Sequence, residues 1–121
     1  MQLMCKSSEE GMTNGCGWFE SQVIHFKIED TVRYKIPHMG WNNLSILKHS
    51  VIFNGINEKD EFYFVHSFHA QGGNSPDILS TTEYEKVFIS GLQRDNIIGL
   101  QFHPEKSHKS GEKIIKNFNY L

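Results

Sequence analysis

The clearest pattern along the chain is the spacing of its apolar residues. Residues 62–66 form a near-continuous aromatic and aliphatic run, which predicts a strand buried on both faces. Weaker strand candidates also occur, and the one at residues 32–36 ends at Pro37, because proline disfavours continuation of the preceding segment. These candidates are shorter apolar runs at residues 23–26, 32–36, 41–47, 84–89 and 96–102, of which the run at 41–47 is interrupted by Asn42-Asn43. Strands therefore dominate the pattern.

Two segments have helical character. Residues 3–10 predict a short helix that Gly11 stops. The C-terminal segment predicts an amphipathic helix with Ser107 as its N-cap and an apolar stripe of Ile114, Ile115, Phe118 and Leu121. Stretches rich in glycine and polar residues predict loops at 12–18, 71–77 and 91–95. The pattern by itself indicates an α+β or mixed fold.

Candidate chemistry is concentrated where the last predicted strand ends, at residues 101–107 (Gln-Phe-His-Pro-Glu-Lys-Ser). His103 and Glu105 lie two residues apart, so in an extended chain their side chains point the same way. A carboxylate there holds an imidazole in one tautomer and stabilises its protonated form. This is the base-and-orienter half of a nucleophilic triad. The simpler alternatives are a surface histidine and a solvated carboxylate.

Composition narrows the class of protein. A chain of 121 residues is at most one domain. The formal net charge of -2 gives no field that would attract nucleic acid or a membrane surface. No apolar run approaches the ~20 residues of a membrane span, and no signal-peptide pattern opens the chain. Cys5 and Cys16 are too few for a secreted disulfide scaffold, so we expect reduced thiols and a cytoplasmic location.

A family resemblance begins at residues 101–107, which resemble the C-terminal signature of class I glutamine amidotransferases. The branch most similar is the glutaminase subunit of imidazole glycerol phosphate synthase. Residues 37–42 (Pro-His-Met-Gly-Trp-Asn) and 62–67 (Phe-Tyr-Phe-Val-His-Ser) resemble two further segments of that branch. Residues 1–3, with 7–11, resemble the helix after the family's nucleophile. Four segments in family order make the resemblance specific.

The resemblance implies an α/β fold: the C-terminal part of the flavodoxin-like class I glutamine amidotransferase fold, with a strand-rich middle section. In the family the nucleophile lies in a Gly-x-Cys-x-Gly elbow directly before Met-Gln-Leu. That cysteine would fall three residues upstream of Met1 here. We therefore expect residues 1–121 to form a partial domain, about the last three-fifths of the complete protein. On its own it would lack the nucleophile and the oxyanion segment.

The resemblance also assigns roles to individual residues. His103 and Glu105 correspond to the catalytic base and its orienting carboxylate. Gln2, His66 and Ser67 correspond to residues around the substrate glutamine. Trp41, Tyr63 and Lys106 correspond to the interface with the synthase barrel. The plainer alternatives are an exposed helix residue for Gln2, core aromatics for Trp41 and Tyr63, and a solvated cation for Lys106.

The implied activity is glutaminase chemistry without a cofactor. The complete subunit would hydrolyse glutamine and pass ammonia to a synthase/cyclase barrel in a heterodimer that makes imidazole glycerol phosphate. Two alternatives stay open. One is an amidotransferase subunit for amino-sugar synthesis, and the other is an inactive interaction fragment of a synthase complex.

Two thiols and several histidines suggest rival sites. Cys5 lies about two helical turns, or roughly 10 Å, beyond the family's nucleophile position, too far for a base to reach it. Cys16 lies in a glycine loop without an elbow. Zinc ligands could be drawn from His66, His69, His103 and His108 with either cysteine. Their spacings match no known Cys/His module, so we predict no metal site.

Overall fold

Ten strands form two sheets in the computed structural model, which describes residues 1–121. The larger sheet has the order β2-β1-β3-β7-β9-β8-β5, and β10 also pairs with β9, at residues 91–94. The strands are β1 (Cys5–Ser8), β2 (Thr13–Asn14), β3 (Phe19–His25), β4 (His38–Asn42), β5 (Ser45–Ile46), β6 (Phe62–His66), β7 (Phe68–Gln71), β8 (Ile78–Tyr84), β9 (Lys86–Arg94) and β10 (Ile97–Leu100). β1 and β3 pair in parallel, and every other pairing is antiparallel.

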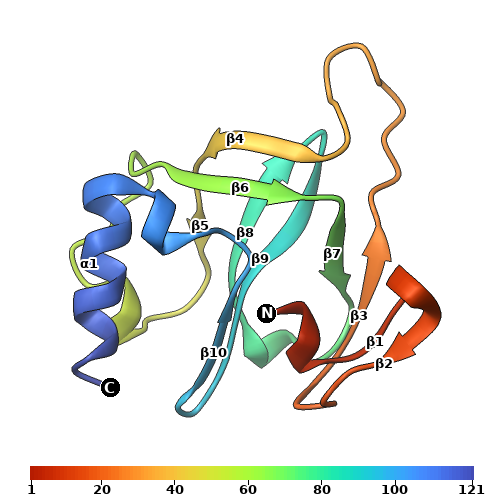
Figure 1. Ribbon diagram of the computed structural model, residues 1–121. Helices are drawn as coiled ribbons and strands as arrows, with labels where there is room; N and C mark the ends of the chain where they lie inside the picture. The colour runs from red at the N-terminus through yellow and green to blue at the C-terminus, as the bar shows by residue number, and fades with distance from the viewer.

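The smaller sheet, which we call the ribbon, consists of β4 and β6 and crosses one end of the larger sheet (Figure 1). The helix α1 (His108–Phe118) stands beside it. Short 3-10 turns complete the structure at Gln2–Met4, Glu10–Met12, Val51–Phe53, Ser75–Asp77 and Pro104–Lys106. Side chains from the ribbon, β8, β9, α1 and the segment after β10 contribute to the main core, which includes Phe62, Phe64, Leu79, Phe88, Phe102 and Ile114.

Several predicted elements are confirmed. β6 has the predicted bounds, β3 contains residues 23–26 except for Phe26, and β10 lies within 96–102. The fold is mixed α/β with a strand-rich middle, also as predicted. Burial of β6 on both faces is wrong. Phe62, Phe64 and His66 are buried, whereas Tyr63 and Val65 on the opposite face are only half-buried.

The helix predicted over residues 3–10 is wrong. The segment is a 3-10 turn followed by β1, because its carbonyl groups bond to a neighbouring loop instead of to their own helix. Cys16 N donates to Leu3 O at 2.8 Å, and Gly15 N donates to Lys6 O at 3.0 Å. The loop approaches so closely that a Cβ at Gly15 would overlap Cys5 O. A contact from outside the segment thus overrides its local helix preference.

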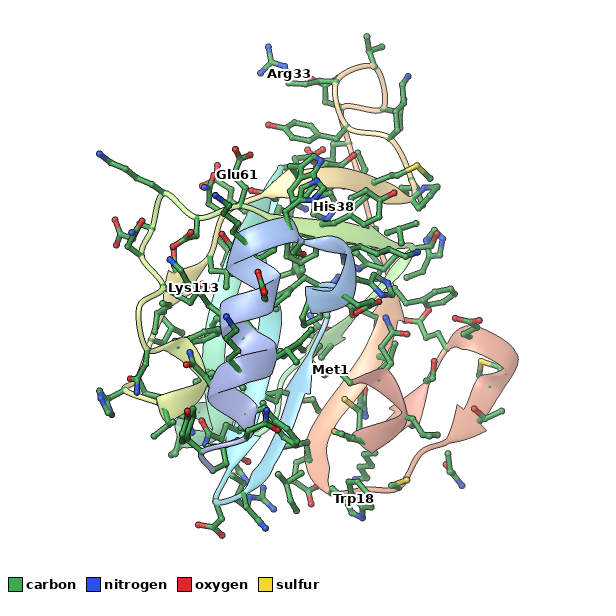
Figure 2. The ribbon with its side chains drawn as sticks, turned by 60° about the vertical axis from the view of Figure 1, so that its left-hand side comes forward. Met1, Trp18, Arg33, His38, Glu61 and Lys113 are labelled. Atoms are coloured by element: carbon green, nitrogen blue, oxygen red, sulfur yellow. The ribbon has the colours of Figure 1, made fainter.

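The strand predicted over residues 32–36 is also wrong. Asp30 organises a turn there, since its side chain accepts from Arg33 N at 3.1 Å and its carbonyl accepts from Tyr34 N at 2.9 Å. Figure 2 shows Arg33 on a loop that projects beyond the ribbon. The predicted strand 84–89 is divided by a hairpin turn at Glu85, where φ is +65°. The loop predicted at 91–95 mostly belongs to β9.

The region predicted at 41–47 contains the end of β4 and all of β5, and the break between them lies at the predicted interruption, Asn42-Asn43. At the C-terminus the helix is confirmed, with Ser107 at the N-cap position. Of its predicted stripe, Ile114 is buried, and Ile115, Phe118 and Leu121 are about half exposed. None of the helices combines the length and the apolar character that a membrane span requires.

Candidate active site

A polar pocket of about 480 Å³ lies where the N-terminal turn meets the ends of β6 and β10. Gln2, His66, Ser67 and His103 all line it, although they are spread over the whole chain. The structure therefore brings together the three residues expected around glutamine and the expected base. Glu105 is not among the lining residues and reaches the pocket through His103.

His103 and Glu105 form the expected pair. His103 Nδ1 lies 2.8 Å from Glu105 Oε1, and the imidazole makes no other hydrogen bond within the chain. Nε2 is therefore available for proton transfer. Partial burial raises the pKa of Glu105, but hydrogen bonds from its own backbone N–H and from His103 outweigh that effect, so its pKa lies below the usual value. The carboxylate thus stays ionised beside the ring, as an orienting group requires.

Ser107 fixes the backbone on which this pair stands. Its hydroxyl donates to His103 O at 2.6 Å and accepts from Tyr63 N at 2.9 Å, and the side chain is fully buried. His103 N also donates to Tyr63 O at 2.9 Å. Ser107 occupies the N-cap position without a capping bond, so the predicted side-chain role is wrong. The hydroxyl instead joins the His103 turn to β6.

Gln2 is held in a defined orientation. Its Nε2 donates to Phe68 O and to Gln101 Oε1, each at 2.9 Å. A backbone carbonyl only accepts hydrogen bonds, so Phe68 O fixes which end of the Gln2 amide faces it. Gln2 Oε1 is then left as an acceptor, and Gln101 Nε2 as a donor, on residues that line the pocket. The wall thus offers both polarities to an amide substrate.

His66 borders the pocket without a free ring nitrogen. Nδ1 lies 2.8 Å from Phe68 O, and Nε2 lies 3.0 Å from His38 Nδ1. Burial lowers the pKa of His66 to about 4, and the nearby imidazoles of His69 and His103 act in the same direction. His66 can therefore border a substrate with its ring or backbone. Its ring nitrogens are not available to donate a hydrogen bond to the substrate or to accept one from it.

Two lining residues with polar side chains, Gln101 and Glu10, were absent from the prediction. Gln101 precedes His103 by two residues, so the same-side rule used for Glu105 could have identified it. Glu10 reaches the pocket from the 3-10 turn Glu10–Met12. Its exposed carboxylate is suited to an ammonium group. No periodicity in the sequence signals Glu10, because the turn that places it was predicted as a helix end.

The three expected interface residues meet on the outward face of the ribbon. Trp41 and Tyr63 are cross-strand partners with ring centroids 5.9 Å apart, and Lys106 Nζ lies 6.0 Å from the Tyr63 centroid. Trp41 also stacks on His108, with 5.0 Å between the ring centroids. Trp41 is 44% exposed, so it is not the core aromatic of the plainer interpretation.

The rival sites find no support in the geometry. Cys5 is fully buried, and burial raises the pKa of its thiol. Neither Cys5 nor Cys16 lines the pocket, and both are free thiols. No group of three or more His, Cys, Asp or Glu side chains is arranged to hold a metal ion.

Fold and site together define a class: an α/β domain that sets a histidine–carboxylate pair beside a pocket walled by amides. The chain belongs to the class-I glutamine amidotransferase family, whose model matches residues 1–120. It is 44% identical over 118 residues to imidazole glycerol phosphate synthase subunit HisH 2 of Methanococcus maripaludis. It is 44% identical over 117 residues to the protein of that name from Pseudomonas aeruginosa.

These matches cover 98% and 97% of the chain, which spans 57% of the length of each relative. The fold also resembles the crystal structure of a Thermoplasma acidophilum protein assigned as part of a GMP synthase. The TM-score is 0.62 at 20% identity, over 82% of this chain and 47% of that one. The expected family fold is thereby confirmed.

Proposed function

We propose that this chain carries the base, its orienting carboxylate and part of the glutamine-binding wall of a glutaminase. The observation that carries the proposal is the His103–Glu105 pair at 2.8 Å, with His103 lining the same pocket as Gln2 and Ser67. Such a pair serves nucleophilic acyl transfer. The family membership supports glutamine as the acyl donor, with its side-chain amide as the group that is attacked.

The proposed reaction is hydrolysis of glutamine to glutamate and ammonia. A cysteine thiolate attacks the amide carbon, and His103 takes the thiol proton and returns it to the departing ammonia. Water then cleaves the thioester and releases glutamate. Glu105 orients His103 and stabilises its protonated form. We propose that the thiol comes from an elbow preceding Met1 in the complete protein, which makes residues 1–121 a partial domain.

Gln2, Gln101 and Glu10 would hold the substrate. Gln2 Oε1 suits an N–H group, Gln101 Nε2 suits a carboxylate oxygen, and the Glu10 carboxylate suits the α-ammonium group. Ser67 and the His66 ring would close the remaining wall. All these groups belong to amino-acid recognition, and none requires a cofactor.

The proposed partner is a synthase barrel that makes imidazole glycerol phosphate and receives the ammonia. The relatives named as subunits of that synthase favour this acceptor over an amino-sugar synthase. The exposed Trp41, half-buried Tyr63 and Lys106 form one aromatic and cationic patch suited to a protein interface. The free thiols fit a reducing compartment, so we place the complex in the cytoplasm.

The test compares this chain with a longer product that includes the reading frame upstream of Met1. The 121-residue chain should release no glutamate from glutamine. The longer product should do so once its elbow cysteine is present, and His103→Ala should reduce its turnover by roughly 10⁴-fold or more. Glutamate release by the short chain that disappears in His103→Ala would contradict the partial-domain proposal. An inactive longer product with an intact elbow would favour the interaction-fragment alternative.

A partner titration tests the interface. In the longer product, Trp41→Ala and Lys106→Ala should weaken stimulation by the synthase barrel while leaving basal turnover close to that of the unmodified protein. Glu105→Ala should depress turnover with and without the barrel. If both interface variants keep full stimulation and full partner affinity, the interface assignment is wrong.

A further inference from the structure

A path of hydrogen-bonded side chains runs behind the pocket, from the outer strand of the ribbon to His66. Asn42 Nδ2 lies 2.8 Å from Glu83 O and 3.3 Å from His38 Nε2. His38 Nδ1 lies 3.0 Å from His66 Nε2, and His66 Nδ1 lies 2.8 Å from Phe68 O. The two histidines are a cross-strand pair of β4 and β6, and both are buried.

One arrangement of protons satisfies the whole path. Phe68 O only accepts, so the neutral His66 ring carries its proton on Nδ1 and accepts at Nε2. His38 must then donate from Nδ1 and accept at Nε2. Asn42 donates to His38, and its own orientation is fixed because its Oδ1 accepts from Asn43 N at 2.8 Å. Backbone groups thus set the path at both ends.

A proton added to either ring would break this arrangement. On His66 it would place an Nε2–H against the Nδ1–H of His38. On His38 it would place an Nε2–H against the Asn42 amide hydrogens. Neither added proton has an acceptor, and an unpaired buried charge is costly.

The surroundings also oppose a charge on the pair. His66 packs against Phe26, Phe64 and Phe88 at ring-centroid distances of 5.0, 5.7 and 5.0 Å. His38 stacks on Phe64 and on Tyr84. Aromatic rings on several sides therefore replace the water that would solvate an imidazolium.

The titratable groups that face His66 are the imidazoles of His38, His69 and His103, and none of its hydrogen bonds involves a carboxylate. The carboxylates of this region are Glu9, which acts on His69, Glu10, which lines the pocket, and Glu105, which is paired with His103. Burial is the main reason that the pKa values of His38 and His66 both fall to about 4.

We propose that His38 is a positioning residue that holds His66 neutral, so that His103 is the imidazole of the pocket that takes up a proton. His66 and His103 line the same pocket and interact electrostatically. A charged His66 would therefore oppose the imidazolium that His103 must become between attack and departure of ammonia. The catalytic part of this role rests on the proposed function, whereas the neutral pair does not.

The test is a titration of the histidine rings in the 121-residue chain labelled with ¹⁵N-histidine, at low protein concentration. At neutral pH, His38 and His66 should both appear as the neutral Nδ1–H tautomer. His38→Phe keeps an aromatic ring but removes the donor to His66 Nε2. In this variant the pH at the midpoint of the His66 ring titration should rise by about one unit or more. His38→Asn, which restores a donor, should bring the midpoint back toward the unmodified value.

His49→Phe is the matched control, because His49 is exposed and outside the path; it should leave His66 unchanged. An unchanged His66 midpoint in a folded His38→Phe variant would overturn the proposal. If that variant does not fold, the tautomer of His66 in the unmodified chain tests the proposal instead. An Nε2–H tautomer on His66 there would also overturn the proposal. The titration needs no turnover. Absence of glutaminase activity in the longer product would therefore refute the proposed function while leaving the neutral pair standing.

Discussion

Ser107 shows how a single hydroxyl positions the site. It donates to the backbone of the proposed base and accepts from the ribbon strand beside it. Ser107→Ala should lower the free energy of unfolding by about 1–3 kcal/mol, because Tyr63 N–H loses its acceptor in a buried setting. Urea denaturation measures the change. Ser45→Ala, at an exposed serine, is the control and should have little effect. Equal losses in the two variants would show that Ser107 has no special role.

The buried histidine pair predicts an acid-sensitive fold. In the folded chain the pKa values of His38 and His66 lie near 4, below the ordinary 6.5. The unfolded chain therefore binds more protons between these values, so stability falls as the pH decreases from 6.5 toward 4. The slope should reach about 1.4 kcal/mol per pH unit for each histidine. Above pH 6.5 this contribution should be constant.

Urea midpoints measured across that range would test this dependence. His38→Phe should show a shallower slope, because one titrating group is gone and the pKa of the other lies closer to its unfolded value. His49→Phe should keep the slope of the unmodified chain. A flat profile for the unmodified chain would contradict the buried neutral pair.

At the scale of the elements, α1 is fitted tightly against the turn that carries the proposed base. A Cβ at Gly111 would overlap the carbonyl oxygen of Pro104 and would lie 2.9 Å from the Cβ of Ser107. Gly111 belongs to α1, where alanine normally favours the helix by about 1 kcal/mol. The contact with backbone atoms has no flexible side chain to give way, so the helix and the turn would have to separate.

Gly111→Ala should therefore destabilise the fold by about 1–3 kcal/mol despite its better helix propensity. Thermal unfolding would measure this loss. Lys109→Ala changes an exposed position of the same helix and should have an effect close to zero. If Gly111→Ala raises the unfolding temperature, the close packing of α1 on the Pro104 turn is not a constraint.

At the scale of the whole molecule, the chain leaves an apolar groove uncovered between α1 and β10. The groove has a volume of about 310 Å³, and Ile115 and Phe118 at its rim are 50% and 57% exposed. β10 pairs along one edge only, which leaves backbone groups free beside the groove. Exposed apolar surface next to an open strand edge favours association.

The 121-residue chain should therefore self-associate, with an average mass by light scattering that rises with concentration. The double variant Ile115→Lys and Phe118→Lys should lower that mass, because charges oppose burial of the groove. Lys109→Glu alters a charge away from the groove and should not. A monodisperse monomer with one cooperative thermal transition would contradict the prediction.

Local sequence patterns were sufficient to identify the His103–Glu105 pair and several elements. The predicted contact between His103 and Glu105 is present at 2.8 Å, although a 3-10 turn at Pro104–Lys106 makes it and the expected extended chain does not. The apolar run at 62–66 and the stripe at 114–118 predict β6 and α1. The predictions of β6 and α1 succeed because each depends on neighbours within a few residues, where strand and helix periodicity hold.

Other features depended on partners far along the chain and emerged only in the folded molecule. Residues 5–8 form a strand because N–H groups of a neighbouring loop donate to their carbonyl groups. The Ser107 hydroxyl accepts from Tyr63 N and does not cap α1. The His38–His66 pair depends on the register of β4 against β6, which no local pattern encodes. Gln2 and Gln101, 99 residues apart, meet only when the N-terminal turn lies against β10. The buried polar groups of these segments had to find partners, and long-range contacts supplied them.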